Sequence, residues 1–81
     1  MRTELSQLKS ELLKLNINPD LIGVDELPLI EGFCIYDVRS HLEVFYSERG
    51  SKVDCQEFSD ILKAIEFFKD KVLSEPSFRL R

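Results

Sequence analysis

The sequence predicts an α+β domain with the element order α-β-β-β-α, in which two helices pack on an antiparallel three-stranded meander. Near both ends of the chain, apolar residues recur every three or four positions, which is the period of an amphipathic helix. Between these stretches, residues 33–38, 42–47 and 53–58 alternate apolar and polar side chains and are rich in β-branched and aromatic types, as strands are. The length of 81 residues fits a single domain, residues 1–81.

The first predicted helix carries leucines spaced three and four residues apart: Leu5, Leu8, Leu12 and Leu15. A stripe of barely two heptads is typical of the core side of a helix, because a coiled coil usually needs three or four heptads. Pro19 disfavours helical geometry at Asn18, and asparagine tolerates the left-handed conformation that follows many helices. We therefore expect the helix to end within residues 16–19.

Residues 21–30 are apolar but follow no clear period, and Gly23 and Pro28 interrupt them. We expect this segment to cross one end of the core as a loop with a short helical turn or strand. Three residues, 39–41, are expected to join the first two strands tightly. In the next connection, Gly50 is expected to take the first central position of a type II′ turn, where a positive φ is required.

The second predicted helix follows the third strand directly and buries one side. The apolar positions on that side are Ile61, Ala64, Ile65, Phe68 and Val72. Pro76 stops the helix, and the alternating tail of residues 78–81 either pairs with a sheet edge or frays, with fraying as the default expectation.

The strand alternation assigns side chains to two faces of the sheet. Continued through the connection at residues 39–41, it places eight residues toward the helices: Cys34, Tyr36, Val38, Leu42, Val44, Tyr46, Val53 and Cys55. The opposite face then combines acidic and large apolar side chains, which need a covering helix or a partner. We predict that this face binds a partner through five residues: Ile35, Asp37, Glu43, Phe45 and Asp54.

The charge is unevenly placed along the chain. Fifteen acidic and eleven basic residues give a net charge of −4, and residues 16–48 hold seven acidic side chains against Arg39 alone. An acidic middle argues against a nucleic-acid partner, because phosphates require basic surface, and it suits a basic protein partner. Without a continuous apolar stretch to enter a membrane or serve as a signal-peptide core, we expect no membrane partner and a cytoplasmic location.

Catalytic, metal and cofactor motifs are weak in this sequence. Cys34 and Cys55 are expected to be reduced, buried small hydrophobes. His41 lies in a tight hairpin, a poor place for a nucleophilic pair, and its spacing from the cysteines matches no zinc signature. Since a glycine-rich phosphate loop is also missing, we expect no catalytic residue, no metal site and no cofactor, and therefore no enzyme.

A segment in the second half of the chain resembles a known family. It consists of V-F-Y-S-E-R-G at residues 44–50, then Phe58 and A-I-E-F-F at residues 64–68. This is similar to the W-x-V-Y-Y-S-E-R-G segment, the phenylalanine and the helical A-C-E-Y-F of small immunity proteins that bacteria carry against polymorphic and contact-dependent-inhibition toxins. Leu42 stands where that family has Trp, and the helix opens with S-D-I-L at residues 59–62 where the family runs strongly acidic.

The resemblance implies a non-catalytic immunity protein that binds a cognate toxin domain and blocks its active site or its access to substrate. The acidic middle is consistent with a nuclease-type toxin, whose substrate cleft is basic. Glu48 and Arg49 either contact the partner or stabilise the hairpin. In the second case Arg49 bonds a nearby carboxylate or carbonyl, and we favour this structural role. The alternative function is a small non-catalytic adaptor or homodimerisation domain that associates through its exposed sheet face or its tail.

Overall fold

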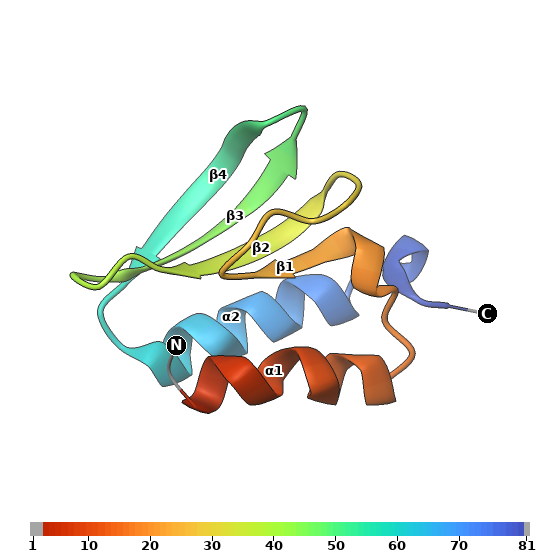
Figure 1. The fold of residues 1–81 in the computed structure, drawn as a ribbon, viewed down its shortest axis with the longest axis horizontal. Helices are drawn as coiled ribbons and strands as arrows, with labels where there is room; N and C mark the ends of the chain where they lie inside the picture. Colours follow the sequence, from red (N-terminus) through yellow and green to blue (C-terminus); the bar gives the residue numbers. More distant parts are fainter. Residues whose placement is uncertain (1–2, 81) are drawn as a thin grey trace.

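The computed structural model describes residues 3–80 and shows two layers, a four-stranded sheet with both helices on one of its faces (Figure 1). The helices are α1 (Thr3–Lys14) and α2 (Ile61–Leu73), and single 3₁₀ turns follow as η1 (Pro19–Leu21) and η2 (Pro76–Phe78). The strands are β1 (Ile22–Val24), β2 (Gly32–Asp37), β3 (Leu42–Glu48) and β4 (Ser51–Phe58). The predicted α+β class with two helices packed on a sheet is confirmed.

The sheet is mixed and runs in the order β1-β2-β3-β4. Strands β2, β3 and β4 form the predicted antiparallel meander, and β1 adds a fourth strand that pairs in parallel with β2. The purely antiparallel three-stranded sheet was therefore an incomplete prediction. Three residues of β1 inside an irregular apolar segment are too short to show alternation.

The core lies between the sheet and the helices, and its residues come from every layer. Leu5, Leu8 and Leu12 of α1 are buried there, as the leucine stripe predicts. Leu15 is instead 51% exposed, because α1 ends at Lys14 and Asn16 turns the chain with a φ of 64°. The Ile17 amide then donates to the Leu12 carbonyl, which closes a Schellman motif and buries Ile17 in place of Leu15.

The β2–β3 connection contains one residue more than the sequence suggests. Asp37 lies opposite Leu42, so four residues, 38–41, join the strands, and the Asp37 carboxylate accepts the amide of Arg39, whose φ is 74°. A one-residue change of register moves every side chain of a strand to the other face. Ile35 and Phe33 therefore point toward the helices, and the placement of Cys34 and Tyr36 on the helix side was wrong.

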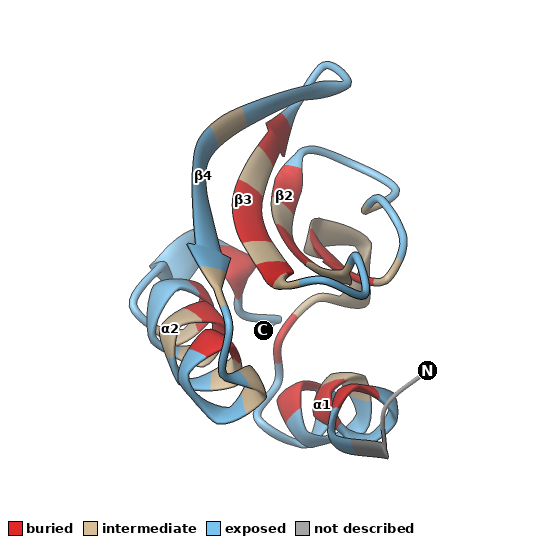
Figure 2. Cartoon of the chain, turned by 90° about the vertical axis from the view of Figure 1, so that its left-hand side faces the viewer, coloured by how far each residue is buried: buried red, intermediate tan, exposed pale blue. Residues whose placement is uncertain are grey.

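The β3–β4 turn also differs from the prediction. Glu48 pairs with Ser51, so the two central residues are Arg49 and Gly50, with φ values of 53° and 82°. Positive φ at both central positions defines a type I′ turn, whose backbone twist matches the twist of the two strands better than that of a type I or type II turn. The register then shifts at a bulge around Asp54, whose φ is 53°. Beyond this bulge most of β4 is exposed along the edge of the sheet (Figure 2).

Residues 25–31 return from β1 to β2 across the face that the helices leave uncovered. A parallel connection usually needs a dozen or more residues, so this one passes unusually close to the strands. A side-chain carbon at Gly23, which pairs with Cys34, would overlap the carbonyl of Glu26. Glycine at this position therefore lets the loop lie directly on the sheet.

The end of the chain is held through residue 80. Phe78 is buried against the core, and its ring lies tilted against Phe33 with the centroids 5.6 Å apart. Its carbonyl accepts the Asn18 amide at 2.7 Å, and the Leu80 amide donates to the Asn16 carbonyl at 2.6 Å. The tail therefore pairs with the segment after α1, and the default expectation of a frayed tail was wrong for residues 78–80.

Candidate functional site

The face of the sheet away from the helices, which we call the open face, meets an exposed aliphatic cluster on the loop of residues 25–31. In that loop Leu27 is 55% exposed, Leu29 83% and Ile30 55%. We call these three residues the loop patch. They are held in place because the Ile30 amide donates to the Asp20 carbonyl and the Asp25 amide donates to the Ile35 carbonyl. The loop patch therefore sits on a loop fixed at both ends.

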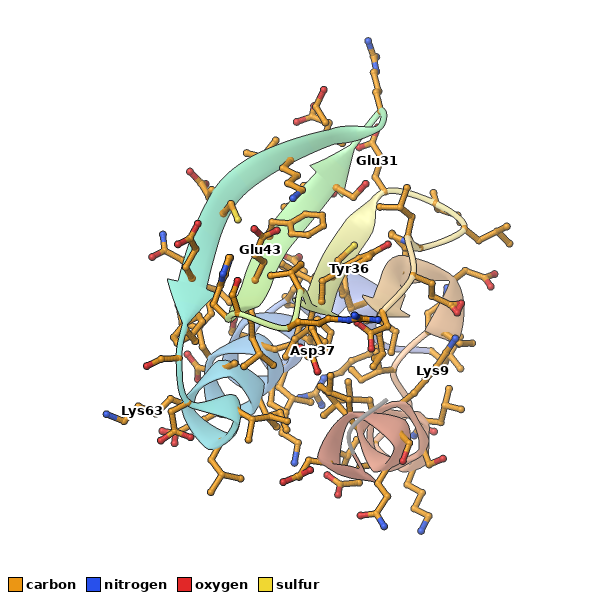
Figure 3. The ribbon with its side chains drawn as sticks, turned by 60° about the vertical axis from the view of Figure 1, so that its left-hand side comes forward. Lys9, Glu31, Tyr36, Asp37, Glu43 and Lys63 are labelled. Carbon is orange, nitrogen blue, oxygen red and sulfur yellow. The ribbon has the colours of Figure 1, made fainter. Side chains whose placement is uncertain are left out.

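The centre of the open face is an aromatic pair with charges above it. Tyr36 and Phe45 stack with ring centroids 5.6 Å apart, and the Lys52 ammonium lies 5.1 Å from the Phe45 ring. Figure 3 shows Tyr36 and Glu43 on this part of the sheet. Lys52 also donates to Glu43 at 2.6 Å. This bond to Lys52, followed by that to His41, lowers the pKa of the Glu43 carboxyl, while the bond to Glu43 raises the pKa of Lys52. These charges are fixed on the face before any partner binds.

Two shallow hollows flank the loop patch. One of about 260 Å³ lies between Leu27 and the Tyr36–Phe45 pair, with Val38 on its far side. The other, of about 350 Å³, follows the loop from Leu27 to Glu31 and reaches the β3–β4 turn at Arg49. Leu27 lines both hollows, so the loop patch forms a ridge between two depressions that side chains of a partner can fill.

Two acidic side chains flank the loop patch. Glu26 and Glu31 stand on either side of it in sequence and are exposed, and Glu31 also lines the second hollow. We call these two residues the acidic rim. Arg49 lines the same hollow as Glu31, and Lys52 lines the first one.

Of the five predicted partner-binding residues, three do not lie on the open face. Ile35 is fully buried beneath the helices. Asp37, opposite Leu42 at the end of β2, is half-buried and caps the turn that follows. Asp54 lies at the bulge of β4 and lines a hollow on the helix side. The register change in β2 and the bulge in β4 explain these errors.

The other two, Glu43 and Phe45, do lie on the open face, on β3 as the alternation predicts. Phe45 is only 2% exposed, however, because Tyr36 and Lys52 cover it. Glu43 retains a partly exposed carboxylate, which is committed to Lys52 and His41. Their role in partner binding remains a prediction, and the exposed apolar anchors are those of the loop patch.

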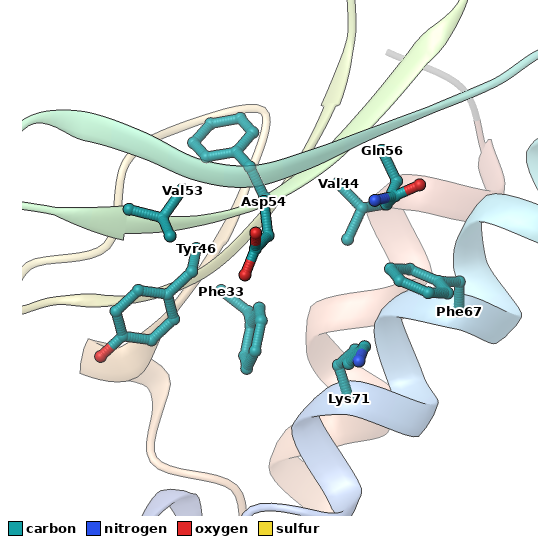
Figure 4. A pocket seen from close by; sticks show the side chains of 9 residues that line it. Phe33, Val44, Tyr46, Val53, Asp54, Gln56, Phe67 and Lys71 are labelled. Carbon is teal, nitrogen blue, oxygen red and sulfur yellow. The ribbon is translucent and has the colours of Figure 1, made fainter.

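A separate groove of about 370 Å³ opens on the helix side, where β4 diverges from α2 (Figure 4). Phe33, Tyr46 and Phe67 line its floor, and Asp54 and Lys71 stand at its margins. Lys71 lies over the Phe67 ring at 5.3 Å. This groove is shallow and lacks a nucleophile or a charge pair joined by a hydrogen bond among its described lining residues.

The two cysteines differ in their environment. Both thiols are free, and Cys34 is buried as predicted, but Cys55 is exposed on the edge strand, so its predicted burial was wrong. Burial raises the pKa of Cys34 to about 12, which keeps this thiol protonated and unreactive at neutral pH. Arg49 is exposed at the turn, and within residues 3–80 it has no hydrogen bond or ion pair, contrary to the structural role that we favoured.

The acidic loop of residues 20–31 is the second place at which the sequence suggests an interface, but the aliphatic side chains of the loop patch were not predicted as its anchors. The residues of the loop patch belong to an apolar segment without a period, and such a segment can equally be core or surface. Leu27, Leu29 and Ile30 are exposed because β1 pairs in parallel with β2, so that residues 25–31, which connect the two strands, cross the outer side of the sheet. The usable signal was the run of aliphatic residues between Glu26 and Glu31, because acidic flanks are unusual for a buried segment.

Comparison with protein-family models, with curated proteins and with solved structures found no match to this chain. None of the helices within residues 3–80 combines the length and the apolar character needed to cross a bilayer.

Proposed function

We propose that this chain is an immunity-type protein that binds a basic toxin domain through the loop patch and its acidic rim. The observation that carries the proposal is the exposure of Leu27, Leu29 and Ile30 together on one fixed loop. A cluster of large aliphatic side chains that a small domain leaves in water is typical of a protein-binding surface. The resemblance of residues 44–68 to immunity proteins supports a toxin as the partner.

The rim supports a basic partner. Glu26 and Glu31 are exposed beside the ridge, and the excess negative charge of residues 16–48 lies on the same part of the chain. Complementary charges speed the encounter of two proteins, whereas a few buried apolar anchors set the lifetime of the complex. A nuclease-type toxin, with a basic substrate cleft, fits both features, and the bound immunity protein would cover that cleft.

A homodimer through the same surface is the alternative, and the charges disfavour it. In a two-fold contact the same patch meets itself, so the acidic rim of one copy would face the acidic rim of the other. Like charges held together across an interface oppose association. A basic partner avoids this repulsion, which is why we place a different protein on the loop patch.

Co-expression with the protein encoded directly upstream tests the proposal. We expect that protein to stop growth when it is expressed alone, and this chain to restore growth and to co-elute with it in one complex. The proposal fails if the upstream protein is harmless or if the two proteins elute separately. A homodimer of this chain alone that needs Leu29 would support the alternative function instead.

A further inference from the structure

A second cluster of titratable side chains lies at the other end of the open face, where the β2–β3 connection meets the end of β4. Glu43 on β3 stands directly opposite Glu57 on β4 in the antiparallel ladder. Like charges in a direct cross-strand pair destabilise a sheet unless a cation offsets them. Lys52 contacts one oxygen of Glu43, and among residues 3–80 the partner of the Glu57 carboxylate is the imidazole of His41.

The spacing of the three donor groups matches a metal site. His41 Nε2 lies 3.2 Å from Glu43 Oε2 and 3.7 Å from Glu57 Oε2, and all three donor atoms fall within 4.8 Å of one another. Bonds of about 2.0–2.2 Å to a tetrahedral zinc ion separate neighbouring ligand atoms by roughly 3.3–3.6 Å. The two distances from His41 are close to this range. A movement of the exposed Glu57 side chain is enough to bring its donor atom to the spacing of a tetrahedral site.

Two of the ligands are already oriented. The Ser40 hydroxyl lies 2.9 Å from His41 Nδ1, which leaves Nε2 directed at the carboxylates. Lys52 holds Oε1 of Glu43 at 2.6 Å, so Oε2 is the oxygen that faces the imidazole. A partner on the second ring nitrogen, as Ser40 is here, fixes the imidazole of natural metal sites, and its loss typically weakens metal binding about 10- to 100-fold.

We propose that His41, Glu43 and Glu57 bind a divalent transition metal ion, with zinc as the best fit. An imidazole nitrogen with two carboxylate oxygens suits zinc and its neighbours, whereas calcium and magnesium prefer oxygen ligands alone. Three protein ligands leave a fourth position for water or for a group from a partner. Cys55 is exposed on the same strand, two residues before Glu57, so the test below includes a variant without this thiol.

A bound ion would join the loop of residues 38–41 to β3 and to the edge strand β4, and it would offset the repulsion between the two glutamates. The site is independent of the proposed toxin binding, because none of its residues belongs to the loop patch.

Titration of the full chain with Zn²⁺ by calorimetry, and with Co²⁺ by visible absorption, tests this inference. We expect one ion per chain and a tetrahedral cobalt spectrum. His41→Ala and Glu57→Gln should each weaken binding at least tenfold, while Glu66→Gln, which removes an exposed acid on α2, should leave it unchanged. Glu57→Gln keeps the shape of an exposed side chain, so it remains informative if His41→Ala fails to fold.

A variant with the opposite expected sign sharpens the test. Lys52→Gln removes a positive charge beside the site and keeps an amide that can donate to Oε1 of Glu43, so it should raise the affinity for zinc severalfold. Binding that persists in Cys55→Ser and disappears in His41→Ala supports the site. The proposal is overturned if the wild-type chain binds no ion saturably, or if Cys55→Ser abolishes binding while His41→Ala retains it.

Discussion

Phe45 stacks on Tyr36 beneath the Lys52 ammonium, and this contact buries Phe45 to 2% exposure on the face that the helices leave uncovered. Phe45 is therefore part of the packed structure. Phe45→Ala should lower the free energy of unfolding by about 3–5 kcal/mol, because it removes a buried ring and leaves a cavity. Urea denaturation measures this loss. Leu62→Ala, at an exposed position of α2, is the control and should change stability by less than about 0.5 kcal/mol. A wild-type midpoint for Phe45→Ala would mean that the ring is free and that it could serve as an anchor after all.

The type I′ turn predicts opposite effects at its two central residues. Arg49→Gly should be neutral or stabilise the hairpin by up to about 1 kcal/mol, since an L residue with positive φ is strained and glycine is not. Gly50→Val should destabilise by about 1–3 kcal/mol, because a β-branched side chain resists a φ of 82°. Thermal melts of both variants decide the turn type. A type II′ turn centred on Gly50 and Ser51 would instead make Arg49→Gly destabilising, as glycine weakens a strand.

The close passage of residues 25–31 over β1 predicts a cost at Gly23. Gly23→Ala places a methyl group against the Glu26 carbonyl and should destabilise the fold by about 1–3 kcal/mol, as overpacking does. Hydrogen exchange should show the amides of residues 25–31 losing protection first, because the loop is displaced before the sheet opens. Equal loss of protection throughout the sheet would argue that the loop does not rest on Gly23.

Burial of Cys34 predicts a loss of stability at alkaline pH. The pKa of this thiol is raised from 9.0 in the unfolded chain to about 12 in the fold. Between these values the unfolded chain has released its proton and the folded chain has not, so stability is complete below about pH 9 and falls as pH rises toward 12. Denaturation midpoints from pH 8 to pH 11 measure the slope. Burial raises the pKa of the Cys55 thiol as well, but this side chain is exposed. The slope should therefore become clearly shallower in Cys34→Ala and less so in Cys55→Ser, and equal slopes in all three proteins would contradict the assignment to Cys34.

Much of the fold follows from periodicity, and the errors come from connections. The buried sides of the two helices, at Leu5–Leu8–Leu12 and Ala64–Phe68–Val72, depend on residue spacing within one segment, and this spacing can be read from the sequence. The face of β2 depends on whether three or four residues link it to β3, and the Asp37 cap that adds the fourth is a side-chain contact that hydrophobic alternation does not encode. The parallel pairing of β1 similarly depends on a close approach at Gly23 that only the folded chain displays.

The candidate site was predictable to a smaller extent. Glu43 and Phe45 share a face because β3 alternates, yet their exposure is set by Tyr36, whose face was misassigned. The loop patch lies in a segment without periodicity, and the pairing of Glu43 with Glu57 requires the register across the bulge at Asp54. A surface built from several segments therefore depends on the register between strands. A single sequence predicts this register poorly where the connecting turns are short and irregular.

Leu29 is the most exposed of the large aliphatic side chains in the described structure, and it tests the central proposal most directly. Leu29→Asp should leave the melting temperature unchanged, because a side chain that is 83% exposed contributes little to the core. Leu62→Asp makes the same chemical change at a 65% exposed position on α2, outside the loop patch, and is the matched control.

The measurement is the Kd of each variant for the purified upstream-encoded protein, by surface plasmon resonance at two ionic strengths. We expect Leu29→Asp to weaken binding by at least about 2 kcal/mol, or roughly 30-fold, mainly through faster dissociation, and Leu62→Asp to bind as the wild type does. Wild-type affinity and lifetime for Leu29→Asp, or an equal loss in Leu62→Asp, would contradict binding through the loop patch.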